Sequence, residues 1–260
     1  MDRAGADAPE VFAVSYDPVD VLAEFAADHG ITYALLSDVG SVVIEALGLL
    51  NRHAEQQQAH FGSTYDDRKK RMPHPGTFVL DADGIIVDRR FEQSHRRRPS
   101  GSVLMADALA GVDGGAAVSA SASGSGLQVR AWLHTGAYRP QQQLEVRVAL
   151  AVDAGAHVYV EPVPKGFTPL TLRLQGPKSL AAGDPPLPAG VSFRVEGLDQ
   201  EFLVVDGKIR TAVPFRIDEG EGHVALELEV AYQACTAMEC FPPEALRLEL
   251  ALEGRPVLRP

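Results

Sequence analysis

In the second half of the chain, apolar and polar residues alternate one for one over several runs. Successive side chains of a strand point to opposite faces, so each run has one apolar face. With 127–134 and 209–217 this makes about seven strands punctuated by Gly and Pro, which is typical of an all-β antiparallel sandwich over 127–260. The clearest runs are Leu144, Val146, Val148, Leu150 and Val152; Leu170, Leu172 and Leu174; Val191, Phe193 and Val195; Val224, Leu226, Leu228, Val230 and Tyr232; Leu246, Leu248, Leu250 and Leu252.

Residues 1–110 have a different pattern, in which short apolar runs alternate with helical stretches. We expect a strand at 11–17 and a helix at 18–30 that stops at Gly30, because glycine readily ends a helix. A second strand at 31–38 precedes a helix that Asp38 or Ser41 can cap. Two strands joined by a turn follow at 76–90, and the last helix spans 102–111. This order predicts an α/β domain.

The segment 111–126 contains only small and polar side chains. So little apolar area does not offset the entropy lost on ordering the chain. A length of 260 residues also exceeds the usual size of one domain. We therefore predict domains at 1–110 and 127–260, joined by a flexible linker at 111–126.

The charge balance excludes two classes of partner. The chain has 24 Lys and Arg against 35 Asp and Glu, a net charge of -11, which repels nucleic acid and anionic membrane surfaces. It contains no apolar stretch near the roughly 18–20 residues that span a bilayer, and the start lacks the apolar core of a signal peptide. The histidines match no metal motif, so neither a metal nor an organic cofactor is expected.

Both cysteines lie in the segment YQACTAMECFPPE, with four residues between Cys235 and Cys240. This spacing, with Pro242 and Pro243 behind it, suits a turn that brings the two Cα atoms within bonding range, roughly 4.4–6.8 Å. In the preceding run the even-numbered residues are apolar. Cys235 should therefore point away from the core, with its thiol near the surface. A ring this small adds little stability, which favours redox exchange, while a local staple remains the alternative.

The stretch 224–252 resembles the N-terminal domain of the DsbD thiol:disulfide interchange family, through its "YQ.C" and "C.PP" motifs, and the likeness covers most of 127–252. It implies an immunoglobulin-like sandwich in which Cys235 and Cys240 are the catalytic residues. Phe202, with Glu201, would shield them, although Phe202 is equally a plain core aromatic. For Tyr232 a core position is favoured over a shielding role.

The likeness also implies a thiol or disulfide partner protein, such as a membrane-bound reductant or a thioredoxin-like domain, and a periplasmic or other extracytoplasmic location. In mechanism, a thiolate attacks the disulfide of the partner and the second cysteine resolves the mixed disulfide. The resemblance mildly favours Cys240 as the attacking residue.

Residues 1–110 resemble the redoxin or peroxiredoxin branch of the thioredoxin fold. In that family a central strand and a cysteine-bearing helix precede the segment that resembles 11–18, and neither is found here. We expect either a loosened half-sheet or a fragment as a result, and a natural chain that begins upstream. The likeness rests on VFAVSYDP, YALLSDVGSVVIEALGL and PGTFVLDADGIIVDRRF.

Three functions follow from these patterns. In the first, Cys235 and Cys240 exchange a disulfide with a partner, as in a thiol-disulfide oxidoreductase. In the second, the chain is a non-catalytic binding or scaffold protein with a permanent disulfide. In the third, it is part of a peroxiredoxin whose active cysteine lies upstream, since 1–110 contains no thiolate to attack peroxide.

Overall fold

The structure is a computed structural model that describes residues 10–56, 71–91, 98–99, 103, 115–194, 200–220 and 222–256. It divides into two compact units, Met1–His95 and Arg96–Pro260. This boundary lies before the one expected from the sequence at residue 110. Apart from Val103, the helix predicted at 102–111 lies outside the described residues.

The first unit contains the predicted strand-helix-strand step. Strand β1 (Phe12–Ser15) pairs in parallel with β2 (Ala34–Ser37), and helix α1 (Val19–His29) connects them. Gly30 ends the helix in the left-handed region, at φ 61°, as its position in the sequence predicted. A short helix, α2 (Val42–Ala46), follows β2.

Asp38, and not Ser41, provides the cap of α2. The Asp38 carboxylate accepts hydrogen bonds from the backbone N–H groups of Val42 and Ile44, both at 2.9 Å. The side chain of Ser41 makes no capping bond. Free N–H groups at the helix start need such an acceptor, so the carboxylate fixes where α2 begins.

The remaining strands of this unit, β3 (Gly76–Leu80) and β4 (Ile86–Phe91), form an antiparallel hairpin. The β1–β2 pair and the β3–β4 pair belong to two separate two-stranded sheets. Apolar side chains of these strands remain exposed, with Phe12 at 54% and Val87 at 60%. Among the described residues of this unit, the strands therefore form two separate pairs and not one continuous sheet.

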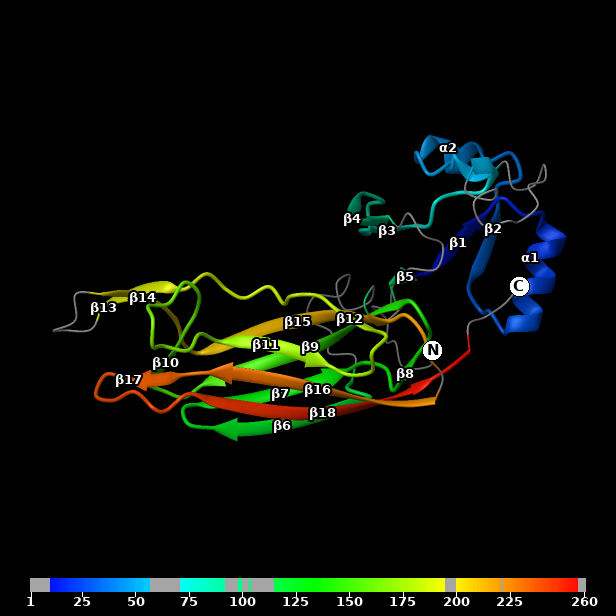
Figure 1. The fold of residues 1–260 in the computed structure, drawn as a ribbon. Coiled ribbons are helices and arrows are strands. Elements are labelled where there is room, and N and C mark those ends of the chain that lie inside the picture. Colours follow the sequence, from blue (N-terminus) through cyan, green and yellow to red (C-terminus); the bar gives the residue numbers. More distant parts are fainter. Residues whose placement is uncertain are drawn as a thin grey trace. The chain divides into compact units, whose positions relative to one another are not determined.

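The second unit is a sandwich, drawn in green to red in Figure 1, whose strands pair antiparallel except for β8 with β18 and β5 with β9. One sheet has the order β12-β15-β9-β7-β6, with β5 beside β9, and a second has the order β11-β16-β18-β8. Their strands are β5 (Arg98–Pro99), β6 (Val118–Gly124), β7 (Leu127–Leu133), β8 (Ala137–Tyr138), β9 (Gln142–Val152), β11 (Thr171–Gln175), β12 (Leu180–Ala182), β15 (Lys208–Ile217), β16 (Gly222–Tyr232) and β18 (Glu244–Gly254).

A third, smaller sheet lies at one end of the sandwich, opposite the end that carries β8 (Figure 1). Its strand order is β13-β14-β10-β17. The strands are β10 (Ala156–Tyr159), β13 (Val191–Arg194), β14 (Glu201–Val205) and β17 (Ala234–Thr236). The alternating pattern predicted β13, through the run that begins at Val191, but it did not predict the short strands β10, β14 and β17.

The main core lies between the apolar faces that the alternation predicted. From β9, Leu144, Val146, Val148 and Leu150 are at most 2% exposed, and from β16, Leu226, Leu228 and Val230 are fully buried. Each such side chain stabilises the fold by roughly 1.5–3 kcal/mol. The run that begins at Val191 is different, because Val191 is 71% exposed on the end sheet.

The predicted flexible linker is wrong over 118–124, where the structure has the regular strand β6. It pairs with β7 from Val118 opposite Leu133 to Gly124 opposite Leu127. The small side chains fit because β6 also lies against β18. A Cβ atom at Gly124 would collide with the Glu244 carboxylate and the Tyr232 hydroxyl. Backbone pairing and close approach thus order a segment that buries little apolar area.

Glu244 fastens the turn after β6 to the start of β18. Its carboxylate accepts hydrogen bonds from the Ser125 N–H at 3.1 Å and from the Ser125 hydroxyl. The Tyr232 hydroxyl donates a third bond at 3.1 Å. These bonds, led by that of the Ser125 hydroxyl, lower the pKa of the Glu244 carboxyl.

We predict that Glu244→Gln destabilises the protein at neutral pH by about 1 kcal/mol, after allowance for solvent screening. The contribution of a carboxyl with a depressed pKa is complete above its unfolded pKa and is lost as the pH falls through its folded pKa. Urea unfolding at neutral pH and near pH 3 measures the difference. Glu253→Gln, on the exposed side of the same strand, is the control. Equal stabilities of Glu244→Gln and the unmodified protein at neutral pH would contradict a stabilising role for the Glu244 hydrogen bonds.

Candidate functional site

The two cysteines close a short hairpin at the end of the sandwich. Cys235 on β17 and Cys240 form an antiparallel bridge and a disulfide, with their Cα atoms 4.0 Å apart, slightly closer than the expected range. The Phe241 N–H donates to the Ala234 carbonyl at 2.9 Å, and the Thr236 N–H donates to the Glu239 carbonyl at 2.8 Å. The predicted turn is therefore formed by residues 236–239.

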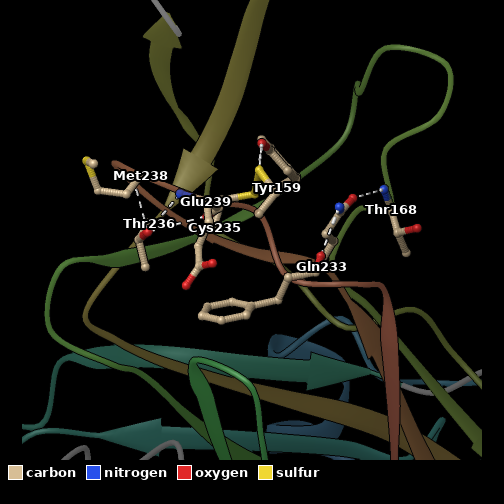
Figure 2. The surroundings of a disulfide bond; sticks show 9 residues. Tyr159, Thr168, Gln233, Cys235, Thr236, Met238 and Glu239 are labelled. Carbon is tan, nitrogen blue, oxygen red and sulfur yellow. Dashed lines mark hydrogen bonds between the residues drawn. A yellow bond between two sulfur atoms is a disulfide. The ribbon is translucent and has the colours of Figure 1, made fainter.

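Thr236 and Gln233 hold this hairpin in place (Figure 2). The Thr236 hydroxyl accepts hydrogen bonds from the N–H groups of Met238 and Glu239, both at 3.2 Å. The Gln233 amide is buried; it accepts from the Thr168 N–H at 3.2 Å and donates to the Phe241 carbonyl at 3.1 Å. Gln233 thus joins the hairpin to the loop before β11. The sequence analysis included Gln233 in the YQ.C motif but predicted no role for it.

The environments of the two sulfur atoms differ. Cys235 is 1% exposed, whereas Cys240 is an exposed residue. The alternation placed Cys235 correctly on the face opposite the main core, since its neighbour Ala234 packs into that core. The expectation of a thiol near the surface was wrong, because a second group of side chains covers this face.

These covering side chains form what we call the aromatic cluster. Phe202 is completely buried, and its ring centroid lies 5.2 Å from that of Tyr159 and 4.8 Å from that of Phe167. Such separations are favourable for aromatic pairs. The cluster consists of Tyr159, Phe202, Val204 and Cys235, with Val163, Phe167 and Phe193 packed against them. Phe202 thus lies in the same packed group as Cys235.

Tyr159 makes the direct polar contact with the disulfide, and sequence reasoning missed it. Its hydroxyl lies 3.1 Å from Cys235 Sγ and 3.5 Å from Cys240 Sγ, and it points at the sulfurs in Figure 2. Disulfide sulfurs carry no hydrogen, so the tyrosine O–H is the donor. Burial raises the pKa of Tyr159, which keeps the hydroxyl protonated.

The other residues named from the resemblance lie elsewhere. Glu201 is exposed; it accepts a hydrogen bond from the Ser192 hydroxyl and forms an ion pair with Arg194 at 3.7 Å. The Ser192 bond, followed by the Arg194 charge, lowers the pKa of Glu201. Glu201 therefore crosslinks β13 to β14 and does not cover the sulfurs.

Tyr232 lies in the main core at 1% exposure. Its hydroxyl points to Glu244, and burial raises its pKa, an effect to which the Glu244 bond adds. This is the core position that we favoured over a shielding role. Within the described ranges no group of three or more His, Cys, Asp or Glu side chains is arranged to hold a metal ion. No helix in those ranges is both long and apolar enough to cross a bilayer.

The fold is thus a redoxin-like region followed by an immunoglobulin-like sandwich with a disulfide at its end. Residues 1–89 match the AhpC/TSA family, and residues 128–252 match the family described as thiol:disulfide interchange protein DsbD, N-terminal. Both resemblances predicted from the sequence are therefore confirmed. The comparison with curated proteins found no significant match.

Two similar solved structures come from bacteria. The N-terminal periplasmic domain of ScsB from Proteus mirabilis shares 13% identity over 52% of this chain and 51% of that chain, with a TM-score of 0.38. The reduced DsbD N-terminal domain of Neisseria meningitidis shares 16% identity over 57% of this chain and 94% of that chain, with a TM-score of 0.30. This chain thus spans about half the length of the ScsB domain.

We predict that the two thiols of the reduced protein react with a maleimide at different rates. In the Cys235→Ser variant the remaining Cys240 thiol should react several times faster than the remaining Cys235 thiol of Cys240→Ser, because Cys235 is buried under the aromatic cluster. Stopped-flow labelling measures both rates. In guanidinium chloride the rates should become similar, and similar rates in the folded proteins would contradict the asymmetry of the site.

Proposed function

We propose that this protein is a thiol-disulfide oxidoreductase that exchanges its Cys235–Cys240 disulfide with the thiols of a partner protein. The observation that carries the proposal is the difference between the two sulfur atoms. Cys240 is exposed to a partner, while Cys235 is buried beside the Tyr159 hydroxyl. A permanent structural disulfide does not require this difference between its two sulfur atoms. In exchange, however, one sulfur must be attacked while the other leaves.

The attack begins at Cys240. A thiolate of the reduced partner forms a bond with Cys240 Sγ, the Cys235–Cys240 bond breaks, and Cys235 Sγ leaves with the electron pair as a thiolate. Tyr159 already donates a hydrogen bond at 3.1 Å to this sulfur, and the bond strengthens as negative charge develops.

A second thiolate of the partner completes the cycle. It attacks the partner sulfur of the mixed disulfide and expels Cys240 as a thiolate, so that two electrons have passed to the cysteine pair. The reverse sequence reduces a partner disulfide through the same intermediate, with Cys240 as the attacking thiolate. No metal or organic cofactor enters any step.

The family match supports the kind of partner. Residues 128–252 match a family named for thiol:disulfide interchange, and both cysteines lie in that region. We therefore propose a protein partner with a thiol pair, such as a thioredoxin-like domain or a membrane-bound reductant, and an extracytoplasmic location. In this proposal Phe202 shields Cys235 from other thiols, and Glu201 stabilises the β13–β14 hairpin that carries Phe202.

A redox titration tests this function against a scaffold protein with a permanent staple. Equilibrated in glutathione buffers of graded potential, the pair should show a midpoint near roughly -180 to -270 mV, and a midpoint below about -300 mV would identify a structural disulfide. Free thiols are counted after acid quenching. The Cys240→Ser variant is the control, since it should show no midpoint in this range.

The Tyr159→Phe variant tests the hydrogen bond to the leaving sulfur. Reduction of the disulfide by dithiothreitol should slow by about three- to tenfold, the equivalent of one hydrogen bond of about 1 kcal/mol. Stability should change little, because sulfur is a weak acceptor. Tyr138→Phe removes another buried hydroxyl, in the main core, and should leave the rate unchanged. Equal rates for Tyr159→Phe and the unmodified protein would remove Tyr159 from the mechanism.

A further inference from the structure

One buried titratable group beside the disulfide has no place in the mechanism above. His157 on β10 is only 9% exposed, and its Nε2 atom is buried without a hydrogen-bond partner among the described residues. A buried polar atom without a hydrogen bond is destabilising, so an unsatisfied group calls for a functional explanation.

The strand register brings His157 to Cys235. In the β10–β17 pair, His157 lies directly opposite Cys235, and the Cβ atoms of such pairs are about 4.5–5.5 Å apart. Alternation puts His157 on the same face as Tyr159, toward the aromatic cluster, and its ring centroid lies 4.5 Å from that of Phe193. In the disulfide, Cys235 Sγ is bonded to Cys240. Once that bond is broken, rotation about χ1 can carry the thiol toward the imidazole.

We propose that His157 is the base that accepts the proton of the Cys235 thiol when Cys235 resolves the mixed disulfide at Cys240. This inference rests on the proposed function. The Cys235 S–H bond breaks, its proton moves to His157 Nε2, and the Cys235 thiolate forms the new bond with Cys240 Sγ. The mixed disulfide breaks, and the partner sulfur leaves as a thiolate that takes up a proton. In the reverse direction the His157 imidazolium protonates Cys235 as it leaves.

Burial of Cys235 is the reason that it needs such a base. A thiol that is 1% exposed loses its proton reluctantly, since burial disfavours the thiolate and excludes hydroxide from solution. Tyr159 can stabilise the thiolate by donation, but a protonated phenol does not accept the proton. His157 is the neighbouring group with a free basic nitrogen among the described residues.

The charges around His157 are consistent with a neutral imidazole that is ready to accept a proton. Burial lowers the pKa of His157, and the nearby Asp206 carboxylate opposes this effect in part. Among the described residues, Tyr159 and Cys235 are titratable side chains on the same face of the end sheet as His157. On the β13–β14 hairpin, Arg194 and Glu201 alternate to the opposite face, where they pair with each other.

The test measures ring closure, which is the formation of the Cys235–Cys240 disulfide from the mixed disulfide. The reduced full-length chain is mixed with oxidised glutathione at a series of pH values and quenched with acid, and mass spectrometry counts the dithiol, mixed-disulfide and disulfide forms. His157→Phe keeps an aromatic ring against Phe193. His157→Gln, which keeps a polar side chain, is the second variant in case the first folds poorly. His223→Phe makes the same exchange at an exposed histidine and is the matched control.

We expect both His157 variants to accumulate the mixed disulfide. Their ring closure at neutral pH should be at least about 100-fold slower than in the unmodified protein, the low end of what a general base contributes. Their closure rates should rise in proportion to hydroxide concentration, whereas that of the unmodified protein levels off above the pKa of His157. Formation of the mixed disulfide should be unchanged, and His223→Phe should behave like the unmodified protein.

Two other outcomes are distinguishable. If the variants close the ring at the unmodified rate over the whole pH range, His157 is not the base and the proposed function stands. If the unmodified protein forms neither a mixed disulfide nor an intramolecular one, the proposed function fails and this inference fails with it. Cys235→Ser, which should trap the mixed disulfide at Cys240, shows which sulfur glutathione reaches.

Discussion

Successive side chains of a strand point to opposite faces, so Ala234 packs into the main core and Cys235 lies on the opposite face of the same segment. A shift of one residue would exchange these positions, so the register of β17 determines where the sulfur lies. Pairing with β10 fixes that register by placing Ala234 opposite Val158 and Cys235 opposite His157. The Gln233 amide supports it from the side, since it bonds both the hairpin and the loop before β11. Tyr159, His157 and Phe202 can act on Cys235 only because this pairing holds.

The disulfide gains its chemical asymmetry from this arrangement. Cys240 lies after a turn that the end sheet does not cover, while Cys235 lies in the aromatic cluster beside the Tyr159 hydroxyl, which contacts both sulfurs. A ring with so few residues removes little entropy from the unfolded chain, so stability is a weak reason for its presence. The different surroundings of the two sulfurs suit the steps of exchange, in which an accessible atom is attacked and a stabilised one leaves.

The sequence predicted those parts of the structure that are determined by the pattern of neighbouring residues along the chain. The runs at Leu144 and Leu226 are long enough to show their period, and the strand-helix-strand step at 12–37 follows from its own residues. Strand β6 could not be found by counting apolar area, because its order depends on close approach to Tyr232 and Glu244. Tyr159 and Cys235 are 76 positions apart, so spacing alone could not join them. The same limit explains why Cys235 was expected at the surface, since its cover comes from β10, the segment after β10, β13 and β14.

The proposed exchange at this site does not require the buried sulfur to become exposed. A partner thiolate needs access only to Cys240 Sγ, in line with the disulfide bond, while Cys235 leaves or returns from within the aromatic cluster. A cover that stays closed over Cys235 would protect its thiolate from other disulfides, and it would keep water from competing for the Tyr159 hydrogen bond. The resemblance implied that Phe202, with Glu201, shields both cysteines. Because Cys235 is buried and Cys240 is exposed, the cover over Cys235 does not have to move during the proposed exchange. The partner can dock on the turn at 236–239 and leave Phe202 in place.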